Sequence, residues 1–178
     1  RLGADAVIMS VHKTLPAFTQ TALLHLCSDR IAEKKVAQFL GIYETSSPSY
    51  ILMAGIEKSL QIIEKDREML FAAYSRRLAE FRDKTKNLKT LQVLQPSDFS
   101  KQEAFSFDPG KLLILTGNSM SGQALQEILL QEYGLQMEMA SGNYVVAMTS
   151  IMDTDEGFAR LSDALECIDG TVHKKEET

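Results

Sequence analysis

Apolar and polar residues change their spacing several times along this chain of 178 residues, and each change predicts a different element. Residues 5–10 (DAVIMS) form a short apolar run that is typical of a buried strand, and residues 21–27 (TALLHLC) form a second. Between them, residues 14–20 contain a proline and several polar side chains, so we expect a loop there. Residues 30–41 carry apolar side chains at helical spacing and end on a glycine, which predicts a helix.

The longest periodic segment follows a turn at residues 44–50 (ETSSPSY). Ser47 is a candidate N-cap there, and Pro48 suits the first position of a helix. The following apolar residues step by three, four or seven, which predicts one face of a long helix ending near residues 86–87. These residues are Ile56, Leu60, Ile63, Leu70, Tyr74, Leu78 and Phe81.

From residue 88 the chain changes to short elements separated by proline, glycine, serine and aspartate. The pattern predicts four strands and two helices, at residues 90–94, 111–116, 121–132, 136–140, 143–150 and 154–168. The last two strands are joined by Ser141–Gly142, a hairpin signal. The chain is therefore predicted to be α/β in two parts, residues 1–87 and 88–170, with a disordered tail at 171–178.

Composition narrows the class of protein. The chain is 44% hydrophobic and 24% charged, as is usual for a globular protein, and its net charge of -5 argues against a nucleic-acid partner. No apolar run reaches the roughly 20 residues that cross a bilayer. Cys27 and Cys167 lie far apart with no Cys/His cluster near them, so we expect free thiols and no metal site. These features predict a cytoplasmic protein with no membrane partner.

Lys13 lies within residues 9–26 (MSVHKTLPAFTQTALLHL), between two apolar runs that suggest burial. Most lysines are exposed to water, but a buried lysine is readily neutralised, and a neutral amine forms a Schiff base with an aldehyde. Ser10 and His12 place a hydroxyl and an imidazole beside it. The residues alone leave two interpretations open: a solvated surface lysine, or a lysine that binds the aldehyde of pyridoxal 5'-phosphate (PLP).

The stretch S-V-H-K-T-L-P-A-F-T-Q-T-A resembles the PLP attachment site of the Orn/Lys/Arg decarboxylase family, in which Ser-x-His-Lys precedes a Ser/Thr-Gln pair. The preceding G-A-D-A-V, the later T-S-S-P-S-Y-I-L-M-A and the C-terminal Y-G-L-Q-M-E-M-A resemble the same family. Two blocks at this separation are specific, whereas a lone Ser-x-His-Lys is a weak signal. The resemblance is strongest over residues 3–54 and loosest over 88–110.

The resemblance implies the fold and the reaction. Residues 1–87 are expected to be the C-terminal part of a fold-type-I PLP-dependent large domain with a long connecting helix. Residues 88–170 are expected to be a small α+β C-terminal domain. The implied reaction is decarboxylation of a basic amino acid (arginine, lysine or ornithine) to the corresponding polyamine-type amine. The implied assembly is a homodimer or a higher homo-oligomer.

The resemblance also implies roles for single residues. Lys13 holds PLP as a Schiff base and later returns a proton to the carbanion that remains when carbon dioxide leaves. Ser10 contacts the cofactor phosphate, and His12 lies against the phosphate or the substrate side of the cofactor. Thr45, Ser46 and Ser47 lie near the dimer interface, where one of them, most favourably Ser47, reaches a neighbouring subunit's phosphate. Without the resemblance, these last three residues read as a capped turn.

The family also requires residues that this chain lacks, among them an acidic partner for the pyridinium nitrogen and a stacking histidine. We therefore expect an apparently C-terminal fragment of a longer enzyme, incomplete as a catalyst by itself. Two alternatives remain open. One is another PLP-dependent reaction on the same scaffold, transaminase-like or lyase, and the other is a non-catalytic fragment or assembly module.

Overall fold

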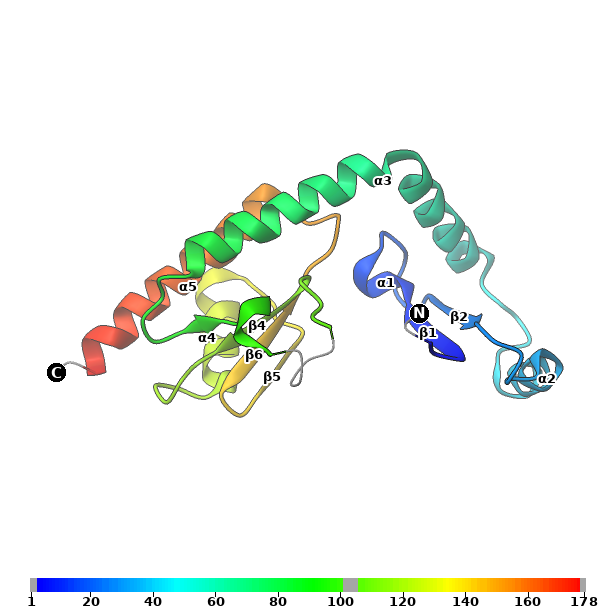
Figure 1. Cartoon of the computed structure of the whole chain (residues 1–178), viewed down its shortest axis with the longest axis horizontal. Helices are drawn as coiled ribbons and strands as arrows, with labels where there is room; N and C mark the ends of the chain where they lie inside the picture. Colours follow the sequence, from blue (N-terminus) through cyan, green and yellow to red (C-terminus); the bar gives the residue numbers. More distant parts are fainter. Residues whose placement is uncertain (1–2, 101–105, 177–178) are drawn as a thin grey trace. The chain divides into compact units, whose positions relative to one another are not determined.

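The computed structural model describes residues 3–100 and 106–176, whose helices and strands are labelled in Figure 1. The chain forms two compact units, Arg1–Arg67 and Glu68–Thr178, and the division between them falls inside the helix α3 (Tyr50–Thr85). The sequence pattern places its division at residue 88, just beyond the end of the same helix. The second half of α3 therefore packs as part of the second unit.

The first unit begins with a β-hairpin that contains one turn of helix. Strands β1 (Ala6–Ser10) and β2 (Ala22–Leu26) pair antiparallel, and α1 (Val11–Thr14) follows β1 directly. Both predicted strands are confirmed, but the predicted burial of the first strand is wrong. Ile8 is 79% exposed, and its cross-strand partner Leu24 is exposed as well. The reason is that the sheet of this unit has two strands, and two strands alone bury little of either face.

Two helices complete the first unit. The predicted helix at residues 30–41 is α2 (Glu33–Tyr43), and the long predicted helix is α3, whose end at Thr85 matches the prediction. The predicted N-cap at Ser47 is wrong. The helix begins at Tyr50, and the Ser49 hydroxyl accepts a hydrogen bond from the backbone N–H of Leu52 at 3.4 Å.

The second unit is built on a four-stranded antiparallel sheet with the strand order β3-β4-β6-β5. These strands are β3 (Gln92–Val93), β4 (Lys111–Leu115), β5 (Met139–Ser141) and β6 (Tyr144–Met148). Two helices, α4 (Gly122–Tyr133) and α5 (Asp155–Glu176), and a short 3-10 turn at Pro96–Asp98 accompany them. All six elements predicted for this part of the sequence are therefore confirmed.

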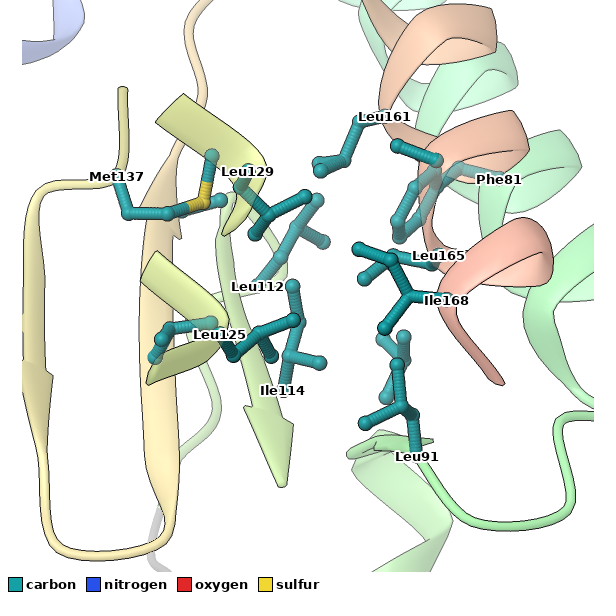
Figure 2. Packing of buried hydrophobic residues seen from close by; sticks show 14 of the residues in the cluster. Phe81, Leu91, Leu112, Ile114, Leu125, Leu129, Met137, Leu161, Leu165 and Ile168 are labelled. Atoms are coloured by element: carbon teal, nitrogen blue, oxygen red, sulfur yellow. The ribbon is translucent and has the colours of Figure 1, made fainter. Parts of the chain in front are cut away.

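One layer of apolar side chains holds the second unit together (Figure 2). Leu112 and Ile114 of β4 lie opposite Ala147 and Val145 of β6, so all four share one face of the sheet. Helices α3, α4 and α5 contribute most of the other side chains, including Phe81, Leu125, Leu129, Leu161, Leu165 and Ile168. This face of the sheet is thus the core of the unit.

The last helix extends further than the sequence pattern predicts. α5 continues to Glu176, so the predicted disordered tail is wrong for residues 171–176, while 177–178 lie outside the described residues. Asp169, only 6% exposed, accepts hydrogen bonds from the backbone N–H groups of Lys89, Thr90 and Leu91 at 2.7–2.9 Å. This carboxylate anchors the C-terminal part of the helix to the segment that follows α3, and Val172 packs against the core beyond it.

The described residues include two free, exposed thiols, Cys27 and Cys167, as expected from their separation in the sequence. Among the helices of those residues, none combines the length and the apolar character that crossing a bilayer requires.

Candidate functional site

Three of the candidate residues lie on one short turn at the end of the hairpin. Ser10 ends β1, and His12 and Lys13 lie in α1. Val11, between them in sequence, is 1% exposed and anchors the turn in the interior of the first unit. Ser10 and Lys13 are exposed, and His12 is half-buried. The structure therefore brings a hydroxyl, an imidazole and a primary amine together on one anchored turn.

The loop that follows returns tightly to this turn. The Val11 N–H donates to the Thr21 carbonyl at 3.1 Å, and the Leu15 N–H donates to the Val11 carbonyl at 2.9 Å. Thr21 is 2% exposed, and its hydroxyl donates to the Phe18 carbonyl at 2.7 Å. Gln20 has a φ of 73°, in the left-handed region, so the backbone turns sharply before it rejoins β2. These constraints fix the backbone that carries Lys13.

His12 adds a side-chain bond to the same closure. Its Nδ1 lies 3.0 Å from the Thr21 carbonyl oxygen. That oxygen therefore has two nitrogen partners, the Val11 backbone and the His12 ring, which matches the two lone pairs of a carbonyl. The imidazole is consequently held to the loop rather than free to rotate.

A glycine in α3 supports the loop from the other side. A Cβ atom built on Gly55 would lie 2.6 Å from Cδ2 of Phe18, closer than real Cβ contacts come. The Phe18 ring thus rests on bare helix backbone, although the side chain as a whole remains 56% exposed. The contact ties the loop that follows Lys13 to the first half of α3.

The predicted burial of Lys13 is wrong for this chain. The side chain is exposed on α1, because the two apolar runs that flank it form a hairpin that is itself largely exposed. Sequence alone gave no signal for this, since an apolar run looks the same whether or not another layer covers it.

Thr45, Ser46 and Ser47 lie in the connection between α2 and α3, and all three are exposed. Their hydrogen bonding is local: the Ser47 N–H donates to the Thr45 hydroxyl at 3.2 Å. Among the described residues, no hydrogen bond joins this connection to Ser10 or His12.

Exposed aromatic and aliphatic side chains flank this connection on both sides. Phe39 and Tyr43 of α2 stack with their ring centroids 6.4 Å apart, and Tyr50 and Ile51 begin α3. Three of the four, Tyr43, Tyr50 and Ile51, are among the most exposed large apolar residues of the chain. Exposed apolar groups on this scale mark a surface that commonly meets another protein.

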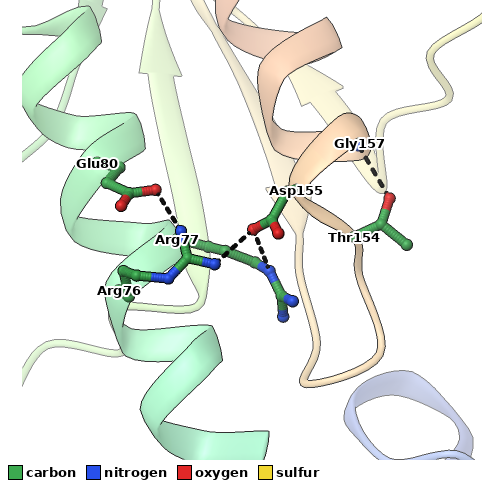
Figure 3. A network of polar contacts seen from close by, with 6 residues as sticks. All are labelled: Arg76, Arg77, Glu80, Thr154, Asp155 and Gly157. Carbon is green, nitrogen blue, oxygen red and sulfur yellow. Dashed lines mark hydrogen bonds and ion pairs between the residues drawn. The ribbon is translucent and has the colours of Figure 1, made fainter.

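The second unit contains a polar network that the sequence pattern did not indicate (Figure 3). Asp155, at the start of α5, accepts hydrogen bonds from Arg76 at 2.7 Å and from Arg77 at 2.8 Å, and Arg76 also donates to Glu80. The two guanidinium groups, Arg77 first, lower the pKa of the Asp155 carboxyl. Because each arginine already has a carboxylate partner, this network joins two helices and does not resemble an open binding site.

The family of this chain follows from its similarity to known proteins. A family model described as the Orn/Lys/Arg decarboxylase major domain matches residues 4–156. The chain belongs to this family. The resemblance found in the sequence is therefore confirmed, and the Lys13 turn lies inside the matched residues.

The curated relatives are much longer than this chain. It is 32% identical over 148 residues to the uncharacterised protein YaaO of Bacillus subtilis, covering 82% of this chain and 30% of the relative. It is 22% identical over 164 residues to an arginine decarboxylase of the same organism, covering 92% of this chain and 34% of that protein. The chain thus spans about a third of the length of these relatives.

Solved structures share its fold. A Francisella novicida lysine decarboxylase matches with a TM-score of 0.76 at 20% identity, covering 94% of this chain and 28% of that one. An Escherichia coli constitutive lysine decarboxylase gives 0.73 at 20% identity, with coverage of 92% and 28%. An alanine–glyoxylate aminotransferase of Nostoc sp. gives 0.67 at 16% identity, with coverage of 93% and 48%. The predicted mixture of helix and sheet is therefore confirmed as a fold shared by decarboxylases and an aminotransferase.

Proposed function

We propose that this chain is part of a PLP-dependent decarboxylase that acts on arginine, lysine or ornithine. One observation carries the proposal: Ser10, His12 and Lys13 lie together on a single anchored turn, in a chain of the Orn/Lys/Arg decarboxylase family. We further propose that residues 88–170 form the small C-terminal domain of that enzyme.

The chemistry of the turn fits the cofactor. Lys13 supplies the primary amine of this turn, and it is the residue that would hold PLP covalently. The Ser10 hydroxyl and the His12 imidazole are both suited to a phosphate group. Bound PLP supplies an electron sink for the bond that breaks next to the substrate amine.

Lys13 also has a role after the carboxylate has left. With PLP and substrate bound, the Lys13 ammonium would lie beside the carbon that loses the carboxylate. It would return a proton to that carbon, which would complete the conversion of an amino acid to an amine. The turn fixes the backbone from which Lys13 projects, because Val11 and Thr21 are buried and hydrogen bonded to each other.

The connection between α2 and α3 is proposed to face a second copy of the protein. Its exposed aromatic and aliphatic flank suits a subunit interface, since Tyr43, Tyr50 and Ile51 have apolar area to bury there. Thr45, Ser46 or Ser47 would then reach the phosphate bound by the neighbouring subunit, with Ser47 the most favoured.

A transaminase-like reaction is the second candidate, because the fold is shared with an aminotransferase. The products separate the two reactions. A decarboxylase releases carbon dioxide and an amine from one substrate, whereas a transaminase forms a keto acid and needs an amino-group acceptor.

The test uses the complete protein, supplied with PLP and given arginine, lysine and ornithine in separate reactions. We expect carbon dioxide and the matching amine from at least one of them, and no measurable release from Lys13→Ala. Lys34→Ala, an exposed lysine on α2, is the matched control and should keep full activity. Keto acid without carbon dioxide would favour the transaminase, and an inert protein would favour a non-catalytic module.

A further inference from the structure

The His12–Thr21 bond determines which ring nitrogen carries a proton. A carbonyl oxygen only accepts hydrogen bonds, so the His12 Nδ1 that lies 3.0 Å from it must be the donor. In the neutral ring the other nitrogen, Nε2, then holds the lone pair. His12 therefore has a fixed tautomer in addition to a fixed position.

The acceptor is well placed to impose this tautomer. Thr21 is 2% exposed, its carbonyl accepts the Val11 N–H as well, and its own hydroxyl is bonded to Phe18. A carbonyl of a buried residue that is already bonded to the Val11 N–H is held by the loop, so the imidazole must adapt to the carbonyl.

We infer that Thr21 is a positioning residue for His12: its carbonyl binds Nδ1–H and leaves Nε2 as the only ring nitrogen available to cofactor or substrate. The inference rests on the proposed function for the identity of that ligand. Nε2 accepts a hydrogen bond when the ring is neutral and donates one, for example to a phosphate oxygen, when the ring is charged. Nδ1 makes no such bond to a ligand, because it already donates to the Thr21 carbonyl.

Two substitutions separate the two nitrogens. The side-chain amide of asparagine places an N–H close to the position of Nδ1, and that of glutamine places one close to Nε2. His12→Asn should therefore keep the bond to Thr21 and lose the contact with the ligand. His12→Gln should lose the bond to Thr21 and keep a polar group on the ligand side.

The first readout is made on the complete protein without cofactor. In ¹⁵N-histidine-labelled protein at a pH where the ring is neutral, Nδ1 of His12 should give a protonated, pyrrole-type signal and Nε2 an unprotonated one. His12→Asn should retain the thermal midpoint of the native protein, and His12→Gln should lower it. The opposite tautomer, or any other ordering of the two midpoints, would overturn the inference.

The second readout is the affinity for PLP, followed by absorbance. His12→Asn should bind PLP about tenfold more weakly, because one hydrogen bond of ordinary strength is lost. An unchanged affinity would show that Nε2 does not face the cofactor. Failure of the proposed function gives a different result, because the native protein itself would then bind no PLP. The measurements without cofactor would still report the tautomer of His12 in that case.

Thr21 allows its backbone and its side chain to be tested separately. Thr21→Val removes the hydroxyl bonded to Phe18 but keeps the carbonyl that accepts from His12 Nδ1 and from the Val11 N–H. The valine variant should therefore retain the native His12 tautomer. A mixture of both tautomers in this variant would contradict the inference that the carbonyl positions the ring.

Discussion

The loop that carries Lys13 depends on a glycine in another element. Gly55 of α3 leaves room for the Phe18 ring, and any side chain there would collide with it. The sequence pattern indicates Ser10, His12 and Lys13 but not Gly55, because a glycine occurs inside a helix for many different reasons. The contact that supports the candidate site is therefore visible only in three dimensions.

Gly55→Ala should destabilise the first half of the chain. The new Cβ would force the Phe18 ring away, and overpacking of this kind costs about 1–3 kcal/mol. Gly41→Ala is the matched control, because nothing lies within 4 Å of a Cβ built on that helical glycine. The control should instead gain about 0.5–1 kcal/mol from helix propensity. Chemical denaturation of both variants of the complete protein measures the difference, and equal shifts would contradict this account of Gly55.

At the level of elements, local signals in the sequence predicted well wherever the partner of a residue is close in the chain. Ser121 was placed at the start of a predicted helix, and it does cap α4 by accepting a bond from the Ala124 N–H. Ser141–Gly142 was predicted as a hairpin turn and joins β5 to β6, with Gly142 at a φ of 50°. Ser47 is not the cap, because the helix begins at Tyr50 and the Ser49 hydroxyl accepts from the Leu52 N–H instead.

Local patterns in the sequence do not indicate contacts between distant residues. Asp169 binds backbone groups that lie about eighty residues earlier, and no local pattern predicts such a bond. For the same reason the burial of β1 and of Lys13 could not be judged, since burial depends on what covers a strand and not on its own side chains.

Asp169→Asn should strongly destabilise the second unit. The substitution replaces one acceptor oxygen by an N–H donor facing backbone N–H groups, and leaves buried donors without a partner. A loss of about 2–3 kcal/mol is expected. Asp163→Asn is the matched control, because Asp163 lies on α5 like Asp169 but is an exposed ion-pair partner of Lys84. The control substitution should cost less than about 1 kcal/mol of stability. Equal losses in urea denaturation would show that Asp169 does not anchor α5.

The Asp155 network should make stability depend on pH. Arg77 and Arg76 lower the pKa of Asp155 in the folded protein. The stability that these ion pairs contribute is therefore fully present above the pKa of about 3.9 that an aspartate has in the unfolded chain. That contribution is lost as the pH falls through the folded pKa. The native protein should therefore have a higher thermal midpoint than Asp155→Asn at pH 7, and the difference should shrink steadily below about pH 5. A difference that is constant with pH would contradict the ion-pair explanation.

At the scale of the whole molecule, the exposed apolar flank of the α2–α3 connection should determine assembly. If it is a subunit interface, Tyr50→Glu places a charge in it and should weaken self-association by about 100-fold or more. Met152→Glu, at an exposed position in the second unit, is the control and should leave assembly unchanged. Analytical ultracentrifugation of the complete protein measures both. An unaltered oligomer in Tyr50→Glu would show that this flank is not a subunit interface.

Borohydride trapping tests most directly whether Lys13 holds the cofactor. The complete protein is incubated with PLP, reduced with sodium borohydride, digested and mapped by mass spectrometry. The account predicts a phosphopyridoxyl group on Lys13 in the native protein and none on that peptide in Lys13→Ala. A native protein that carries the group on a different lysine, or carries none, would contradict the assignment of this turn as the cofactor site.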